Sequence, residues 1–273
     1  MRLSTSIVNV IEQCNLRARW RRIDKAQSAP SELDEAARAG KAVHQALEVV
    51  YRLAQADNYV GPLHTPEWLG RAREAIDTAI TEHGPFEDEE RISDMRLMVL
   101  DYLLDQDEVV GANVLGIEQF VQLGLRKGTN VVGFLDRLDR RDGDEIAVID
   151  YKTSWRRYDT DQLRAELQPQ TYAVLVAKRH TWATRITFEM AELRHRTSAS
   201  VMWTSADLPR LEQQVRERYI AADKKLQQGP WEPNRDVWCN RCEFKAWCPA
   251  WDGTPQPGTW NPEIEDLQPD PEH

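Results

Sequence analysis

The sequence predicts an α/β fold in which a mixed central sheet is flanked by helices. Helical periodicity dominates the first hundred residues, and strand-like alternation follows over residues 113–151. Further helix and strand patterns continue to residue 228, so helices lie on either side of the strand segments in the sequence. The chain has 273 residues, 41% of them hydrophobic and 29% charged, which suits one large globular domain. No apolar run is long enough to span a membrane, so we expect no membrane contact.

Caps and periodicities place the individual elements. Ser4 or Thr5 can cap a first helix that ends in the basic run Arg17–Arg22. Pro169 predicts that a helix over 159–178 starts late or is kinked, because proline lacks a backbone donor and clashes with the preceding turn. The remaining helices are expected at 31–53, 66–83, 89–107 and 207–228, and the strands at 113–124, 130–139, 145–151, 184–193 and 199–203.

The strands at 130–139 and 145–151 predict a hairpin, because a favoured tight-turn dipeptide, Asp142-Gly143, lies between them. Side chains alternate between the two faces of a strand. Asp150 and Lys152 must therefore share one face of the hairpin.

Asp136 is expected on that same face. If it pairs with Val148, it lies diagonally from Asp150, about 7–8 Å away, and both carboxylates can reach one cation. Charged groups among Val, Ile and Leu are costly to bury unless they bind something. Surface charge on an edge hairpin is the alternative interpretation. The neighbouring Arg137 and Asp139 are expected to face away from Asp136 as an outward ion pair.

The hairpin resembles the PD-(D/E)xK nuclease superfamily, specifically its RecB-like exonuclease branch. The signature is G-x-x-D on one strand, here residues 133–136, and a hydrophobic residue followed by D/E-x-K on the next, here 149–152. Two further family motifs stand in the expected order, G-x-x-x-H over 40–44 and Q-x-x-x-Y over 168–172. The resemblance spans roughly residues 4–250 and implies a restriction-endonuclease-like core.

The resemblance also implies a divalent-metal-dependent deoxyribonuclease. Its metal ligands would be His44, Asp136, Asp150 and the backbone carbonyl of Tyr151. Its catalytic residues would be Asp136, Asp150, Lys152, Gln168 and Tyr172. Hard carboxylate oxygens suit Mg²⁺ or Mn²⁺, and a histidine ligand shifts the preference toward Mn²⁺.

The resemblance also implies roles for the catalytic side chains, and two nearby residues have ordinary alternatives. Lys152 would orient or deprotonate the attacking water, and Gln168 and Tyr172 would steady the scissile nucleotide and Lys152. Alternatively, His44 is an ordinary core histidine whose hydrogen bonds are made within the protein. Glu118 is either a further site acid, as the family often has there, or an ordinary exposed strand residue.

The cysteines form one set: Cys14 near the start, then Cys239, Cys242 and Cys248 near the end. Without a secretory signal we expect a cytoplasmic, reducing location, where clustered cysteines bind metal more often than they form disulfides. The segment C-N-L-R-A-R-W at Cys14 resembles the start of the iron–sulfur members of the branch, which implies a [4Fe–4S] cluster on these four thiolates. Zinc is the alternative, because tetrahedral thiolate sites also suit it, and free buried cysteines are a third.

The net charge of −10 bears on the substrate. Residues 252–273 carry six acidic residues and no Lys or Arg, and are expected to form a disordered acidic tail. An acidic protein gains little from duplex phosphates, so we expect a single-stranded DNA substrate, cut from an end. The 5′→3′ polarity rests on the resemblance alone. The run Arg17–Arg22, with Trp20 inside it, is the expected DNA contact, and a solvated helix face is the alternative.

The nuclease domain is expected to span residues 1–251, with a helical insertion at about 60–110 that forms a lid. One rival is a non-catalytic iron–sulfur or zinc module that binds DNA or a protein; another is a hydrolase of non-nucleic phosphate esters. The resemblance implies helicase, recombination or CRISPR-adaptation partners. A helicase motor would be another chain, since no G-x-x-x-x-G-K-[ST] motif is present.

Overall fold

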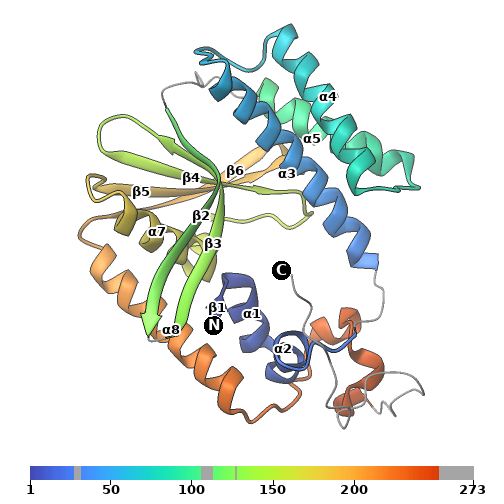
Figure 1. The fold of residues 1–273 in the computed structure, drawn as a ribbon, viewed down its shortest axis with the longest axis vertical. Coiled ribbons are helices and arrows are strands. Elements are labelled where there is room, and N and C mark those ends of the chain that lie inside the picture. Colours follow the sequence, from blue (N-terminus) through green and yellow to red (C-terminus); the bar gives the residue numbers. More distant parts are fainter. Residues whose placement is uncertain (28–31, 106–112, 127, 252–273) are drawn as a thin grey trace. The chain divides into compact units, whose positions relative to one another are not determined.

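The computed structural model describes residues 1–27, 32–105, 113–126 and 128–251 (Figure 1). The acidic tail predicted over 252–273 lies outside these residues. The chain divides into two compact units. The terminal unit comprises Met1–Glu32, Gly124–Val131 and Arg216–His273, and the central unit comprises Leu33–Leu123 and Val132–Val215.

The strands form a mixed sheet, as the sequence predicts. Its order is β1-β3-β4-β5-β6, with β2 paired to β3. The pairs β1/β3 and β4/β5 are parallel, whereas β3/β4 and β5/β6 are antiparallel. The strands are β1 (Arg2–Leu3), β2 (Val114–Arg126), β3 (Thr129–Arg140), β4 (Glu145–Lys152), β5 (Arg185–Glu192) and β6 (Thr197–Thr204). Only β1 is unexpected, because two residues are too short to show a pattern.

The central unit is organised around one apolar cluster. It joins the long helix α3 (Glu32–Ala56) to α4 (Pro66–His83), α5 (Glu89–Leu104) and the middle of β4. Helix α3 supplies Ala42, Val43, Ala46, Leu47 and Val50, a helical spacing that places one apolar stripe on the core. The helices α6 (Thr160–Ala165) and α7 (Leu167–Arg179) contact β6 and β5, respectively. The architecture is a mixed α/β fold with helices flanking the sheet, consistent with a restriction-endonuclease-like core.

The helix predicted over 159–178 is broken at Glu166. A proline ring clashes with the carbonyl four residues earlier, which here belongs to Ala165. Because α7 starts at Leu167, Pro169 falls in the first turn, where a missing donor does no harm. The predicted helix therefore starts at Thr160 rather than late, and its expected kink is a break into two helices.

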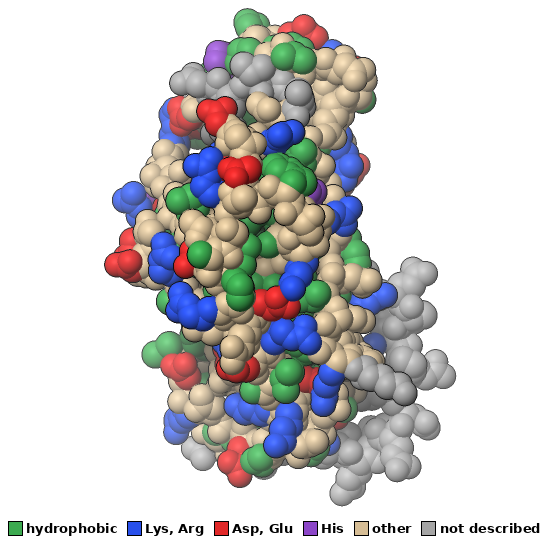
Figure 2. All heavy atoms as spheres, turned by 90° about the vertical axis from the view of Figure 1, so that its left-hand side faces the viewer, with side chains coloured by type: hydrophobic (Ala, Val, Ile, Leu, Met, Phe, Trp, Pro, Cys, Tyr) green, Lys and Arg blue, Asp and Glu red, His purple; other side chains and the backbone are tan. Residues whose placement is uncertain are grey.

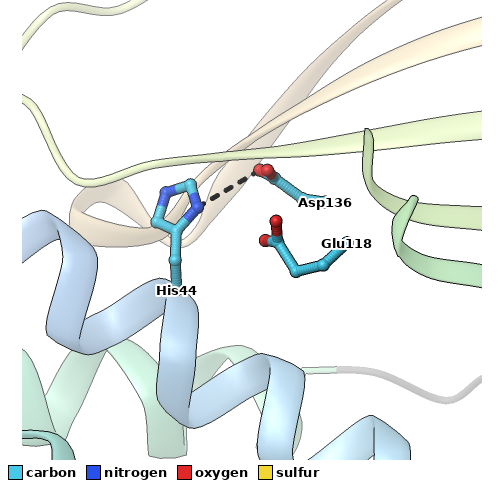
Figure 3. A group of neighbouring side chains, drawn as sticks. All are labelled: His44, Glu118 and Asp136. Carbon is cyan, nitrogen blue, oxygen red and sulfur yellow. Dashed lines mark ion pairs between the residues drawn. The ribbon is translucent and has the colours of Figure 1, made fainter. Parts of the chain in front are cut away.

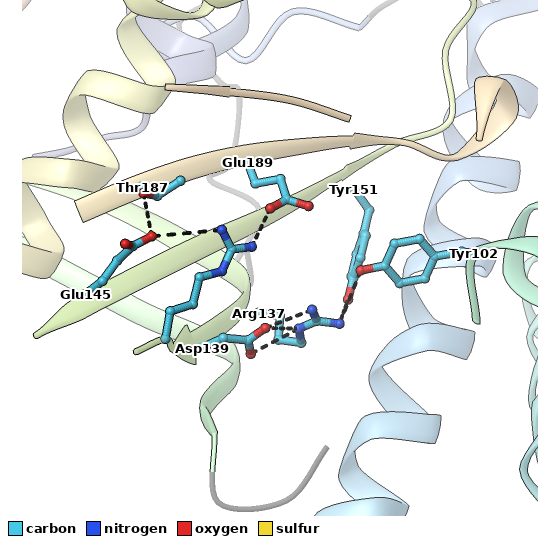
Figure 4. Close-up of polar contacts among 8 residues, drawn as sticks. Tyr102, Arg137, Asp139, Glu145, Tyr151, Thr187 and Glu189 are labelled. Atoms are coloured by element: carbon cyan, nitrogen blue, oxygen red, sulfur yellow. Dashed lines mark hydrogen bonds and ion pairs between the residues drawn. The ribbon is translucent and has the colours of Figure 1, made fainter. Parts of the chain in front are cut away.

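The pair Arg137 and Asp139 corrects a prediction. The two residues pair with each other at 2.8 Å, but the pair is buried rather than outward. The Arg137 guanidinium donates to the hydroxyls of Tyr102 and Tyr151, each at 3.2 Å (Figure 4). It also lies 4.3 Å from the ring centroid of Tyr51. The second face of β3 packs on helices, so these charges are solvated by aromatic and hydroxyl groups instead of water.

The terminal unit contains α1 (Thr5–Gln13), α2 (Asn15–Arg22), the end of α8 (Leu208–Gln228) and the short helices η2 (Val237–Arg241), η3 (Lys245–Trp247) and η4 (Pro249–Trp251). One continuous first helix was predicted, but the extended backbone of Cys14 divides it in two. Asn15 Nδ2 then donates to the carbonyls of Lys225 and Pro230, both at 2.9 Å, so the residue after the break is tied to the end of α8 and the segment that follows it. Among the described residues, no helix is long and apolar enough to cross a membrane.

Candidate active site

The register of the β3–β4 hairpin sets where the motif residues lie along the two strands. Arg137 pairs with Ile149 and Leu138 with Val148, so Asp136 and Asp150 are the next residue on each strand beyond these pairs. The predicted pairing of Asp136 with Val148 is therefore wrong by two residues. The cause is the connection 141–144, where Gly143 has φ +71° and β4 starts only at Glu145.

His44, Glu118 and Asp136 form a group whose ligand atoms all lie within 4.8 Å of one another. The imidazole of His44 projects from α3 toward the two carboxylates on β2 and β3 (Figure 3). His44 Nδ1 lies 3.4 Å from Asp136 Oδ2, which also accepts from the backbone N–H of Tyr151 at 2.8 Å. One imidazole nitrogen and two carboxylate oxygens suit a divalent cation, Mn²⁺ in particular.

Glu118 is brought into this group by an irregularity in β2. Its φ is +45°, in the left-handed region that glutamate rarely adopts. Such a residue interrupts the alternation of a strand and redirects its side chain, as bulges beside active sites do. The sequence left Glu118 undecided between a site acid and an exposed residue, because nothing in Ile117-Glu118-Gln119 signals this backbone conformation.

The three charged or polar residues next to this group form a chain of contacts. Lys152 Nζ lies 2.5 Å from Asp150 Oδ2, and Gln168 Nε2 donates to Asp150 Oδ1 at 2.8 Å. Asp150 is buried, and both of its oxygens are thereby engaged. The structure thus brings His44 and Asp136 together with Glu118, and holds Asp150 with Lys152 and Gln168.

The charges of these groups depend strongly on one another. Burial would lower the pKa of His44, but its hydrogen bond to Asp136 and the charge of that carboxylate raise it above the usual value. Burial would likewise lower the pKa of Lys152, but the charge and hydrogen bond of Asp150 raise it. Burial raises the pKa of Asp150, against the opposing charge of Lys152. Lys152 is therefore a protonated, positively charged group at neutral pH.

Two motif glycines are explained by close packing rather than by turns. A Cβ on Gly133 would lie 2.6 Å from Cε1 of Tyr172, so the ring of Tyr172 occupies the space that any larger residue would fill. A Cβ on Gly40 would lie 3.2 Å from Thr153 Oγ1, directly after Lys152. Tyr172 was expected to steady Lys152 or the nucleotide; the structure places it, buried, against the strand that carries Asp136.

An open depression lies over the metal-ligand group. It is lined by Ala37, Gly40, Lys41, His44, Gln45, Glu48, His83, Glu118 and Asp136. The depression gives a substrate direct access to the three candidate ligands.

Glu118 predicts a pH dependence of stability in the metal-free protein. Burial, with the charges of Asp136 and Glu48, raises the pKa of Glu118 to about 7. The unfolded chain releases this proton near pH 4.3, so the folded state holds more protons between these values and stability falls as pH rises through this window. We expect Glu118→Gln to remove that fall, measured by thermal unfolding in EDTA from pH 4 to 8. Parallel curves for both proteins would contradict the prediction.

The four cysteines lie in the terminal unit and line one pocket. The pocket is formed by Cys14, Cys239, Cys242 and Cys248 together with Gln13, Leu16, Arg17, Trp20, Pro233, Asn234, Asp236, Trp238, Lys245 and Ala250. All four thiols are free. Among the described residues, no three of these sulfur atoms lie within 4.8 Å of one another. Tetrahedral zinc would require sulfur atoms about 3.8 Å apart.

The basic run Arg17–Arg22, which was expected to contact DNA, makes contacts within the protein. Trp20 is only 4% exposed and packs edge-on against Phe244, so its ring cannot stack on a base. Arg17 and Arg21 both pair with Glu243, each at 2.8 Å. Two arginines of the run therefore bind Glu243, which lies between Cys242 and Cys248.

Comparison with known proteins shows the family to which the chain belongs. The model of the PD-(D/E)XK nuclease superfamily matches residues 2–249. No curated protein matches the chain. Among solved structures, the chain is similar to one described as the crystal structure of SSO0001, with 17% identity, a TM-score of 0.32, and coverage of 72% of this chain and 84% of the other. The match over nearly the whole chain, together with the geometry of the acidic site, shows that the chain belongs to the PD-(D/E)XK nuclease superfamily.

Proposed function

We propose that this chain is a divalent-cation-dependent exonuclease that cuts single-stranded DNA from an end. The observation that carries the proposal is the juxtaposition of His44, Glu118 and Asp136, whose ligand atoms lie within 4.8 Å of one another. The carbonyl of Tyr151 would be a further ligand. The backbone N–H of Tyr151 donates to Asp136. The N–H and C=O of one strand residue point toward the same neighbouring strand, so the Tyr151 carbonyl would point toward the strand of Asp136.

The chemistry of phosphodiester hydrolysis fits these residues. A bound divalent cation lowers the pKa of water and neutralises charge on the phosphate. The carboxylate of Asp136 is ionised, because burial raises its pKa less than His44 and the Tyr151 N–H lower it. Lys152 is protonated, so it would donate to the attacking water or to the phosphate oxygens rather than act as a base. Gln168 would keep Asp150, and through it Lys152, in place.

Exposed aromatic rings beside the site support a single-stranded substrate. Phe134 stands two residues before Asp136 on the same face of β3, and its ring centroid lies 5.2 Å from that of Phe120 on β2. Both rings are exposed. Figure 2 shows one face of the molecule, on which basic and acidic side chains are interspersed. Unstacked bases can use aromatic rings, whereas duplex binding relies mainly on phosphate neutralisation.

End dependence is tested by the form of the substrate. We expect linear single-stranded DNA to be degraded with Mn²⁺ while the same strand, closed into a circle, stays intact. Gel analysis of both forms in one reaction measures this. Equal cutting of the circle would show an endonuclease, and no cutting of either form would contradict nuclease activity. Label at each terminus separately gives the polarity, for which 5′→3′ is the expectation.

We further propose that Cys14, Cys239, Cys242 and Cys248 hold a [4Fe–4S] cluster. Two observations support it: all four line one pocket, and Cys14, Cys242 and Cys248 pack against the apolar residues Leu16, Trp20 and Phe244. Each thiolate of such a cluster binds a different iron atom, so the sulfur atoms are expected to stand farther apart than around a single zinc ion. The cluster would join the first and last described segments of the terminal unit.

The cluster proposal has a direct test. Protein purified without oxygen is expected to be brown and to contain about four iron atoms per chain. Cys239→Ser is expected to lower both the iron content and the melting temperature, while Mn²⁺ binding at His44 is retained. One zinc and no iron, even after anaerobic reconstitution, would contradict the proposal.

The rival functions make different predictions. A non-catalytic binding module would bind DNA without cutting it, and a hydrolase of small phosphate esters would act on those and not on DNA. The group at Asp136, Asp150 and Lys152 favours the nuclease, because a scaffold has no use for it. A cytoplasmic location and helicase, recombination or CRISPR-adaptation partners stay predictions from the resemblance.

A further inference from the structure

The loop after β4 presents an aromatic ring beside the proposed catalytic lysine. Trp155 follows Lys152 by three residues, so their Cα atoms are at most about 11 Å apart. The Trp155 side chain is 74% exposed, the largest exposed fraction of any tryptophan in the described residues. Tryptophan combines a large apolar ring with a polar N–H, and it is enriched at binding interfaces for that reason.

Trp155 is held in place from one side. The Arg194 guanidinium lies 4.4 Å from its ring centroid, and the His195 ring lies edge-on at 6.0 Å. Arg194 is itself fixed, because it donates to the Thr153 carbonyl at 3.2 Å and pairs with Asp94. The ring therefore has one face supported and much of the remainder open.

The backbone of the loop is anchored at both ends. The Trp155 carbonyl lies 3.1 Å from His195 Nε2, and the Tyr158 N–H donates to Glu192 at 2.5 Å. Between these anchors, the side chain of Arg157 is 68% exposed, with Glu192 at 3.8 Å as its ion-pair partner. A rigid loop thus offers an exposed ring and an exposed cation next to one another.

We propose that Trp155 stacks on a base of the single-stranded substrate and that Arg157 contacts the adjoining phosphate. The proposal rests on the proposed function and adds a residue that binds the strand beside the cut. The catalytic site itself carries carboxylates, which repel phosphates. Stacking supplies affinity that does not depend on phosphate charge, and it accepts any base because every base has a π-face. Trp20 is buried, so Trp155 is the better placed of the two tryptophans to stack on a base.

The test is a double-mutant cycle in which the Trp155 ring and one base of the strand are removed separately and together. The equilibrium Kd of the full chain for a fluorescein-labelled oligo-dT is measured by anisotropy in EDTA, and then for the same strand with one abasic site moved along it. For wild type, one abasic position is expected to weaken binding about 5- to 100-fold. Trp155→Leu is expected to show that loss on intact oligo-dT and no further loss at that abasic position. Trp155→Phe should recover part of the affinity.

Trp182→Leu is the matched control. Trp182 is also exposed, at 42%, and also carries an arginine, Arg140, at 4.8 Å from its ring. It precedes β5 at the Glu145 end of β4, whereas Trp155 follows the Lys152 end, about 23 Å away along the strand. Its loss should leave the Kd unchanged. Arg157→Gln should reduce the slope of log Kd against log salt by about 0.7, whereas Trp155→Leu should leave the slope intact.

The outcomes separate this proposal from the proposed function. Cleavage by the wild type with Mn²⁺ is measured independently on the same oligonucleotide. Cleavage with an unchanged Kd for Trp155→Leu would overturn the stacking role and leave the ring as a contact for another protein. A wild type that shows the coupling but does not cleave would support the stacking role and contradict the nuclease. An abasic penalty that is equal in wild type and Trp155→Leu, or no binding by the wild type, would also overturn the stacking role.

Discussion

Replacement of Lys152 by methionine is expected to reduce single-stranded DNA cleavage by at least about 10²–10³-fold, the usual effect of removing one preorganised charged group. Lys152 lies 2.5 Å from Asp150 and carries a raised pKa, so its positive charge is the group that is lost. The protein should remain folded. Burial already raises the pKa of Asp150, and this carboxyl can take up a proton once its partner is gone. Single-turnover cleavage with Mn²⁺ measures the effect, and EDTA should stop the wild type.

Lys178→Met is the matched control for this variant. Lys178 is a surface lysine of α7 that also pairs with a carboxylate, Glu212, at 2.6 Å. An exposed pair of this kind contributes little to stability, so both activity and stability should stay near wild type. If Lys152→Met retained more than a tenth of the wild-type rate while folded, the catalytic role of Lys152 would be wrong.

The buried pair Arg137–Asp139 is expected to give the largest loss of stability. Asp139→Ala removes the carboxylate that lies 2.8 Å from the buried Arg137 guanidinium, and arginine cannot release its proton to relieve the loss. Breaking a buried pair from one side costs about 3–5 kcal/mol. Urea denaturation at pH 7 measures the change. A loss below about 1 kcal/mol would contradict the importance of the pair.

The reverse variant should behave differently with pH. In Arg137→Met, Asp139 can become neutral, because burial already raises its pKa. A folded pKa above the unfolded value favours folding at low pH, and this contribution is lost as pH rises. The variant should therefore lie closer to wild type at pH 5 than at pH 7. The double variant Arg137→Met/Asp139→Leu should be more stable than Asp139→Ala, since it removes both charges of the buried pair together.

The motif residues illustrate what local patterns can predict. Alternation and the Asp142-Gly143 turn predict the β3–β4 hairpin, and the structure has its strands at Thr129–Arg140 and Glu145–Lys152. Helix α4 is found at the predicted bounds, Pro66–His83, because Thr65 and Pro66 form a clear start. Such features depend on residues adjacent in the chain, so the sequence alone determines them. The face shared by Asp150 and Lys152 is of the same kind, because it follows from strand period alone.

Other features depend on groups that are distant in sequence. Glu118 joins His44 and Asp136 only through a left-handed backbone conformation in β2, and no local residue type requires it. Trp20 looked exposed in a basic run but is buried by Phe244, more than 220 residues later. Arg137 and Asp139 looked like a surface pair but are enclosed by tyrosines of α3, α5 and β4.

The sequence by itself therefore determined the order of the elements, the mixed α/β fold class and the pairing of the two motif strands, because periodicity and turn chemistry are local. Only the tertiary structure decided the register that pairs Leu138 with Val148, the third member of the metal-ligand group and which tryptophan is exposed. Those properties are set by the partners that packing brings to each side chain, and burial and charge are properties of the assembled neighbourhood rather than of the residue.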